Sequence, residues 1–255
     1  MNMEGVKRSL PYMIRVEPSG WGDCQVEDVQ ILLDNVADQL VQHMTELPRG
    51  VIRVQCRSIE TNPRILYRES PRDDIVIWLT AKDRKWSQYS YQFAHEFCHF
   101  ISDYERLRLK PNMWFHESVC ELASLFVLKQ MALTWQSSPP YKHWQNFAKE
   151  HDKYADAMLN CAENKLPVGV QLPEWFQEHE ASLRHDAFQR QKNFVVAIRL
   201  LPIIQSQPTQ WQSLRYLPNT DASFRDFLAG WRTACPAKHR DFVTEMATAF
   251  RIDIS

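Results

Sequence analysis

The stretch YQFAHEFCHFIS, residues 91–102, places two histidines four positions apart, with a glutamate directly after the first. We predict that it lies in a helix over Gln88–Asp103. On a helix, positions i and i+4 lie one turn apart on the same face, so His95 and His99 can reach one metal ion. Glu96 is rotated by about 100° from His95. Its carboxylate is therefore expected beside the metal, where it could take a proton from a bound water.

A second stretch, WFHESVCE at residues 114–121, contains candidates for the third metal ligand that two histidines alone do not supply. A catalytic zinc site needs a third protein ligand and an open position for water. Glu117 and Glu121 are again four positions apart, on a helix predicted over Asn112–Trp135. The first carboxylate can complete the coordination sphere. The second can accept the free N–H of a ligand imidazole, which fixes the tautomer of that imidazole.

These two helices together resemble the gluzincin metallopeptidases, which include thermolysin and the zinc aminopeptidases. WFHESVCE is similar to the WLNEG helix of the aminopeptidase branch and to the NEAxSD helix of thermolysin. The resemblance covers Ile75 to Leu125 and implies a zinc-dependent hydrolase of zincin-like fold that cleaves a peptide or protein substrate. The implied site consists of Zn²⁺ ligands His95, His99 and Glu117, the general base and acid Glu96, and Glu121 as the partner of a ligand histidine.

The resemblance also implies a substrate strand and a donor that stabilises the tetrahedral oxyanion. IVIWLTA, Ile75–Ala81, matches the family's edge strand, which binds the substrate backbone by β-addition. The donor is a His or Tyr well downstream of the third ligand. Counting along the chain from Glu117, we expect His185 to be this donor, with Arg184 or Arg190 as alternatives.

Two features depart from the family pattern. No GxMEN-type stretch lies upstream of His95, so a dedicated aminopeptidase is not expected. The spacing of 18 from His99 to Glu117 is slightly shorter than usual, which a tighter loop between the helices would absorb. A rival third ligand is Glu105, six positions after His99, where metzincins place theirs. That family requires glycine at the position of Ser102.

Simpler interpretations stay open beside the zinc site. The motif could form an exposed polar helix face, and Glu117 could be a solvated carboxylate. Cys98 and Cys120 flank the ligands closely and are expected to be small buried core residues, with a thiolate ligand as the alternative. The protein could also be a zincin-fold binding or regulatory protein without activity, although an intact Glu96 argues against this. A metal-free helical interaction protein is the third class, and metal analysis would exclude it.

Composition limits the remaining choices. The 30 Lys+Arg and 31 Asp+Glu give a formal net charge of −1, which argues against a nucleic-acid partner. The N-terminus has no apolar signal-peptide core, and the longest apolar run, Phe194–Ile204, is too short to span a membrane. We therefore expect a cytoplasmic protein.

The 6 cysteines include no CxxC pair, so free thiols are expected. The sequence does not indicate the oligomeric state.

The pattern along the chain predicts an α+β fold. A helix from Val26 to about Pro48 and four strands fill the first third, and the strands are expected at Met13–Val16, Val51–Cys56, Ile65–Tyr67 and Ile75–Ala81. From about Gln88 onward the pattern is helical, with further helices expected over Tyr141–Asn164, Asp186–Ile204, Ala222–Thr233 and Lys238–Phe250. We predict two subdomains. Residues 1–108 form a small mixed sheet with helices, including the edge strand and the HExxH helix, and residues 109–255 form a mostly helical part with the third-ligand helix.

Overall fold

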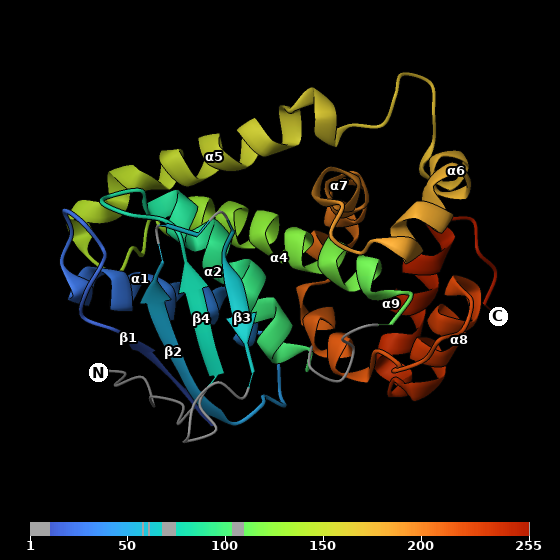
Figure 1. The fold of residues 1–255 in the computed structure, drawn as a ribbon, viewed down its shortest axis with the longest axis horizontal. Coiled ribbons are helices and arrows are strands. Elements are labelled where there is room, and N and C mark those ends of the chain that lie inside the picture. The colour runs from blue at the N-terminus through green and yellow to red at the C-terminus, as the bar shows by residue number, and fades with distance from the viewer. Residues whose placement is uncertain (1–10, 58, 61, 68–74, 104–109, 255) are drawn as a thin grey trace.

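The computed structural model describes residues 11–57, 59–60, 62–67, 75–103 and 110–254 of the chain. These residues form an α+β fold, in which one small sheet is followed by a long helical part (Figure 1). The predicted α+β class is therefore confirmed. The predicted boundary between residues 108 and 109 lies outside the described residues, so the division into two subdomains stays a prediction.

The sheet is mixed and has the strand order β1-β2-β4-β3. Its strands are β1 (Tyr12–Val16), β2 (Gly50–Cys56), β3 (Arg64–Leu66) and β4 (Ile75–Leu79). The strands β1, β2 and β4 run parallel, and β3 pairs antiparallel with β4. All four predicted strands are present, with small shifts at their ends.

The expected edge strand is wrong, because β4 is paired on both sides. Ile77 of β4 lies opposite Val54 of β2 and also opposite Ile65 of β3. Since β3 adds to the outer side of β4, the outer edge here belongs to the short strand Arg64–Leu66. Strand order follows from long-range pairing, which the alternation of side chains within one strand does not encode.

Two helices cover one face of the sheet. α1 (Val26–Val41) connects β1 to β2, and α2 (Trp86–Ile101) follows β4. They pack against each other and against the strands. The side chain of Gln92 on α2 accepts hydrogen bonds from the backbone N–H groups of Thr80 and Ala81, at 3.0 and 3.1 Å. These bonds fix the start of α2 to the end of β4.

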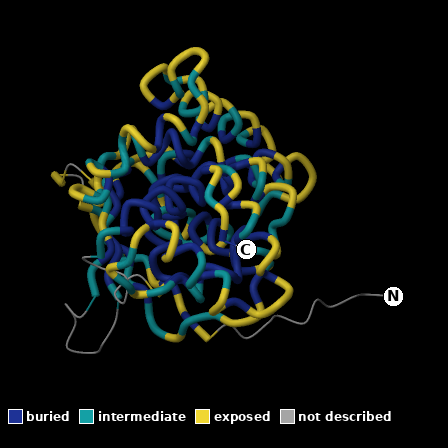
Figure 2. The backbone as a smooth tube through the Cα atoms, turned by 90° about the vertical axis from the view of Figure 1, so that its right-hand side faces the viewer, coloured by how far each residue is buried: buried dark blue, intermediate teal, exposed yellow. Residues whose placement is uncertain are grey.

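The helix α4 (Met113–Thr134) crosses the middle of the molecule (Figure 1). Nearly all of its residues are buried, on every side of the helix, as expected of a helix that is packed all round. Figure 2 shows the same buried centre in a view turned by 90°. One hydrophobic cluster runs from the sheet through α2 and α4 into the C-terminal helices.

The C-terminal part contains α5 (Ala148–Asn160), α6 (Leu172–His185), α7 (Arg190–Ser206), α8 (Phe224–Ala234) and α9 (Ala237–Thr248). Three 3₁₀ segments accompany them, η1 (Lys142–Phe147), η2 (Ala162–Asn164) and η3 (Pro208–Tyr216). The single helix predicted over Tyr141–Asn164 is therefore divided into η1, α5 and η2.

Helix α6 was not predicted. Its sequence contains Pro173, and a proline in the interior of a helix usually ends or kinks it. In the structure this proline lies in the first turn of α6. A proline is tolerated there, since its missing N–H would have no partner within the helix. The following helix, α7, consequently begins at Arg190 and not at Asp186.

Among the described residues, no helix combines the length and apolar composition needed to cross a bilayer. The predicted free thiols are confirmed for all six cysteines. Cys98, Cys120 and Cys235 are buried, and the other three are partly buried.

Candidate metal centre

The two motif helices face each other and bring the predicted ligands together. His95 and His99 lie on α2, and Glu117 lies on α4. The Nε2 atom of His95 is 3.4 Å from Oε2 of Glu117, and Nε2 of His99 is 3.7 Å from Oε1 of the same carboxylate. The side chains are 13%, 5% and 8% exposed, so a solvated polar surface does not describe this group.

The second nitrogen of each imidazole has its own partner on α4. Nδ1 of His95 is 3.7 Å from Oε2 of Glu121, as expected for the carboxylate that orients a ligand histidine. Nδ1 of His99 is 3.4 Å from Sγ of Cys120. With Nδ1 of both rings contacting these groups, Nε2 of both rings is directed toward Glu117. Cys120 is buried, as the sequence predicted, but its contact with His99 was not predicted.

The distances between these atoms fit a zinc site. Two ligand atoms that each lie 2.0–2.2 Å from one tetrahedral ion are about 3.3–3.6 Å apart. The contacts of Glu117 with His95 and His99, at 3.4 and 3.7 Å, are close to that range. Both imidazole nitrogens and the carboxylate can thus share one Zn²⁺ with little movement.

A competing group consists of His95, His99 and Cys120, whose ligand atoms lie within 4.8 Å of one another. We favour Glu117 as the third ligand because it lines a cavity, while Cys120 is fully buried and does not. An ion on the Cys120 side would have no open position for water. Burial also raises the pKa of the Cys120 thiol well above its usual value, so the thiol is neutral in the metal-free protein.

Glu121 is held by two residues besides His95. The hydroxyl of Tyr91 donates a hydrogen bond to Oε2 of Glu121. Nε of Arg190, the first residue of α7, is 3.2 Å from Oε1 of the same carboxylate. Nη2 of Arg190 also donates to the Tyr91 hydroxyl, at 3.1 Å. Tyr91 precedes His95 by one helical turn, and that spacing is the sequence signal that could have revealed it.

The carboxylates make the centre attract positive charge. Burial disfavours protonation of His95, but Glu121 and Glu117 outweigh it and raise the pKa of His95 well above its usual value. Burial also raises the pKa of Glu121, but His95 and Arg190 outweigh this and lower it below its usual value. In the metal-free protein a proton on His95 therefore provides a positive charge that a bound cation would otherwise supply.

His99 has the opposite electrostatic environment. Burial and the neighbouring rings of His116 and His95 lower its pKa well below the usual value. A neutral imidazole is the form that binds a metal. His116 is itself buried, with its ring 4.9 Å from that of His99 and its Nε2 2.6 Å from Oγ of Ser102. Its ring therefore packs against that of His99.

Glu96 is positioned for acid–base chemistry next to the ligands. It lines the same cavity and is 4% exposed. Burial and the nearby Glu117 raise the pKa of Glu96 to about 7, although His95 and a hydrogen bond from the Ile65 backbone oppose the shift. The contact with Ile65 places β3 directly beside the carboxylate.

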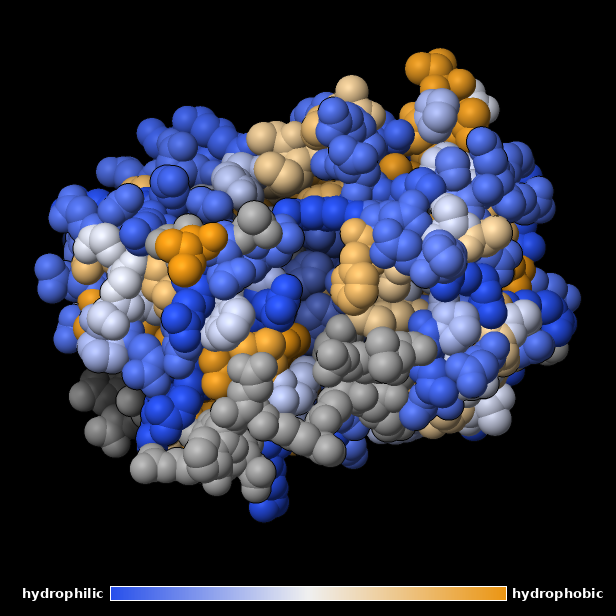
Figure 3. Space-filling view, in the orientation of Figure 1, coloured by the Kyte–Doolittle hydropathy of each residue, from blue (hydrophilic) through white to orange (hydrophobic). Residues whose placement is uncertain are grey.

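The cavity has a volume of about 650 Å³, and Figure 3 shows this face of the molecule hollowed near its centre. One wall is β3 with its flanking residues, from Asn62 to Tyr67. The opposite wall comes from α4 and from the start of α7. Phe188, just before α7, is 65% exposed and lines the cavity.

The structure does not bring His185 into this cavity. His185 is the exposed last residue of α6 and is not among the cavity residues. Arg184 donates to Oδ1 of Asn112, at 2.6 Å, and is likewise not a cavity residue. Of the three donors considered from the sequence, Arg190 lines the cavity. The rival ligand Glu105 lies outside the described residues.

No protein-family model, no curated protein and no solved structure matches this chain. The resemblance to the gluzincins therefore rests on the two motifs and on the geometry of the residues that they contain.

Proposed function

We propose that this protein is a zinc-dependent hydrolase that cleaves peptide bonds at a gluzincin-like, zincin-fold site. The observation that carries this proposal is the convergence of Nε2 of His95, Nε2 of His99 and the Glu117 carboxylate beside an open cavity. These three residues would hold Zn²⁺. When bound, the ion acts as a Lewis acid and lowers the pKa of a coordinated water to about 7.

Glu96 is the group that moves the proton. Its carboxylate accepts a proton from the attacking water and returns it to the leaving nitrogen of the substrate. Both transfers take place in the cavity, which Glu96 lines together with His95 and His99 and where it lies beside the backbone of β3.

Arg190 provides positive charge on the other side of the cavity. It takes the place that the sequence analysis gave to His185, because it lines the cavity and His185 does not. Its bonds to Glu121 and Tyr91 hold the guanidinium in place. A fixed cation of this kind stabilises negative charge that develops on the substrate carbonyl oxygen.

The edge strand β3 is the expected contact for the substrate backbone. Among the described residues, no strand pairs with the side of β3 that faces away from β4. An extended peptide can add to such an edge through backbone hydrogen bonds. Because Ile65 contacts Glu96, a peptide on β3 would lie next to the general base.

The substitution Glu96→Gln tests the proposal. It keeps the size of the side chain and removes its ability to take a proton, so zinc content should stay at one per chain. Hydrolysis should fall by about 10²–10⁴-fold. A peptide library with mass-spectrometric detection and metal analysis of the same samples provide both measurements. Retained hydrolysis would exclude the role of Glu96.

A binding or regulatory protein with the same fold is the alternative. In that case the wild-type protein would bind zinc and cleave none of the library peptides.

A further inference from the structure

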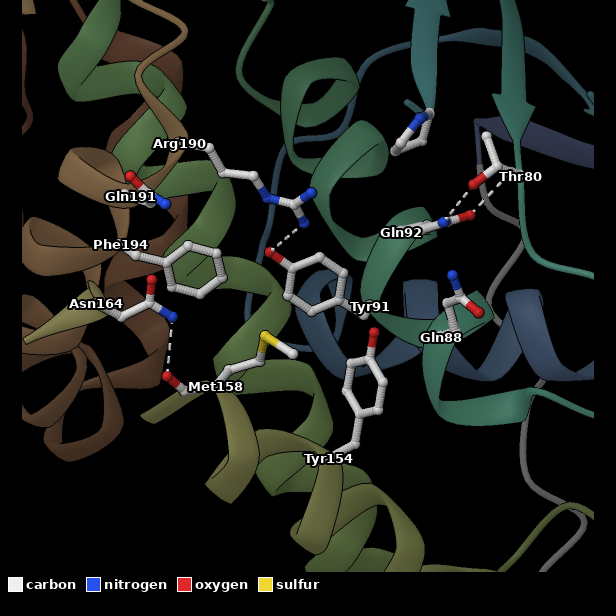
Figure 4. A pocket seen from close by; sticks show the side chains of 11 residues that line it. Thr80, Gln88, Tyr91, Gln92, Tyr154, Met158, Asn164, Arg190, Gln191 and Phe194 are labelled. Atoms are coloured by element: carbon white, nitrogen blue, oxygen red, sulfur yellow. Dashed lines mark hydrogen bonds between the residues drawn. The ribbon is translucent and has the colours of Figure 1, made fainter. Parts of the chain in front are cut away.

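A second cavity, of about 320 Å³, adjoins the metal centre. Its walls come from the first turns of α2 and α7 and from α5, as Figure 4 shows. Pro63, Tyr91 and Arg190 line both cavities, so the two spaces are neighbours that share a boundary. The proposed function does not use this second cavity.

Both cavities open along one face of α2. Gln88 and Tyr91 line the second cavity, while Tyr91 and His95 line the first. These positions are three and four residues apart, which places them on the same face of the helix. From Gln88 to His95 the helix rises by about 10 Å. An extended peptide advances about 3.3 Å per residue, so the second cavity lies roughly three substrate residues from the metal centre.

One part of the wall of the second cavity is aromatic. The rings of Tyr91 and Phe194 are stacked, with centroids 6.2 Å apart and an interplanar angle of 9°. The ring of Tyr154 lies 6.0 Å from that of Tyr91. Most of the other lining residues are polar, and polar groups decide what a cavity can bind.

Two of the polar groups have no hydrogen-bond partner among the described residues, the Tyr154 hydroxyl and the Gln88 side-chain amide. Both are shown without a bond in Figure 4. By contrast, the amide of Gln92 is used by Thr80, and the amide of Asn164 donates to the Met158 carbonyl at 3.0 Å. The cavity therefore offers two groups that can donate hydrogen bonds to a ligand.

The charge of the lining indicates a ligand that accepts hydrogen bonds and carries negative charge. Arg190 is the cation at the boundary, and the lining contains no aspartate or glutamate. Burial raises the pKa of the Tyr154 hydroxyl, which keeps it protonated and able to donate. Arg190 also contacts Glu121 at the metal centre, but no carboxylate lines the second cavity itself, so hydrogen-bond donors beside this guanidinium favour a negatively charged acceptor there.

We propose that the second cavity is a substrate subsite that binds a carboxylate through hydrogen bonds from Tyr154 and Gln88, with Arg190 as the cation at its boundary with the metal centre. The inference rests on the proposed function, since it assigns this carboxylate to the same substrate, about three residues from the scissile bond. The carboxylate is either that of an Asp or Glu side chain or the C-terminal group of the chain being cleaved.

Small probes test the subsite without any need for cleavage. N-acetyl-glutamate α-amide carries a side-chain carboxylate, N-acetyl-alanine carries a terminal one, and N-acetyl-glutamine α-amide is the neutral control. We expect one or both carboxylates to bind the purified protein about tenfold more tightly than the control in NMR titrations. The carboxylate that binds more tightly identifies the source. Equal binding of all three probes, or binding of none, overturns the inference.

Matched variants locate the binding. Tyr154→Phe and Gln88→Ala should each weaken binding of the carboxylate probe by about tenfold, because each removes one hydrogen bond to a charged group. Tyr141→Phe makes the same substitution on a tyrosine that lines neither cavity and should leave binding unchanged. A carboxylate bound directly to zinc would be insensitive to all three substitutions, and that result contradicts the subsite.

A charge reversal separates this inference from the proposed function. Gln88→Glu should weaken binding of the carboxylate probes and improve binding of N-acetyl-lysine α-amide. Cleavage of peptides without any preference for a carboxylate at this distance would contradict the subsite alone. Probe binding that depends on Tyr154 and Gln88, without cleavage of any peptide, would contradict the peptidase and leave the carboxylate site in place.

Discussion

Two buried histidines show how differently the same side chain behaves in two regions of this molecule. His151 on α5 is fully buried against Trp135, and Nδ1 of the imidazole is 3.1 Å from Oγ of Ser87. Burial lowers the pKa of His151 to about 4. His95 is nearly as buried, yet Glu121 and Glu117 raise its pKa well above the usual value.

The comparison shows that burial alone does not make a metal site. His151 is surrounded by aromatic rings and one hydroxyl, and its Nε2 has no hydrogen-bond partner among the described residues. His95 is surrounded by carboxylates, which favour positive charge at that position. The proposed metal centre thus depends on the acidic side chains of α4 as well as on the histidines themselves.

The largest effect, on zinc affinity, is expected from removing the carboxylate of Glu117, which contacts both histidines. Glu117→Ala should lower zinc affinity by more than about a hundredfold, beyond the 10–100-fold cost typical of losing a residue that only orients a ligand. Competition with a chromophoric chelator measures the affinity. Cys120→Ala, on the same helix, removes the contact with Nδ1 of His99 and should lower zinc affinity by no more than the 10–100-fold typical of losing a residue that orients a ligand. If the loss followed Cys120 instead, the alternative group of His95, His99 and Cys120 would be the metal site.

The next largest effect is the pH dependence of stability that His151 causes. Its pKa is about 4 in the folded protein and 6.5 in the unfolded chain. The unfolded chain therefore binds more protons, so the free energy of unfolding falls as the pH drops from about 6.5 to 4. The loss from this residue is about 2–3 kcal/mol.

Urea denaturation at pH 7 and pH 4 measures this difference. His151→Gln removes the titrating group. Between pH 7 and pH 4 its free energy of unfolding should therefore fall by about 2–3 kcal/mol less than that of the wild-type protein. An equal loss in both proteins would show that His151 is not held neutral by its surroundings.

A smaller effect is expected from Glu121, which orients His95 without being a proposed ligand. Glu121→Gln should reduce zinc affinity by about 10–100-fold, and should lower the pKa of His95 in the metal-free protein. Chelator competition and NMR titration of the histidine ring protons measure the two quantities. A reduction as large as that of Glu117→Ala would make Glu121 a ligand in its own right.

Much of the centre could be predicted from the sequence because its signals are local. The spacing of four between His95 and His99, and again between Glu117 and Glu121, depends on helical geometry alone. Both helices formed where the pattern predicted them. The structure then brings their motif faces together at 3.4–3.7 Å.

Other predictions failed where they depended on contacts distant in the chain. Ile75–Ala81 has the composition of a strand, but its neighbours on both sides are set by pairing with β2 and β3. His185 was placed by counting residues from Glu117. The unpredicted helix α6 ends at His185 and leaves it exposed, while α7 brings Arg190 to the cavity.

The sequence by itself determined which side chains can bind a metal, because their positions repeat with the period of the helix. Only the tertiary structure decided which nitrogen of each imidazole faces the carboxylate of Glu117, which strand forms the edge, and which cation lines the cavity. Those choices depend on how α2, α4, α7 and the sheet pack against one another, and packing is settled by contacts between residues far apart in the chain.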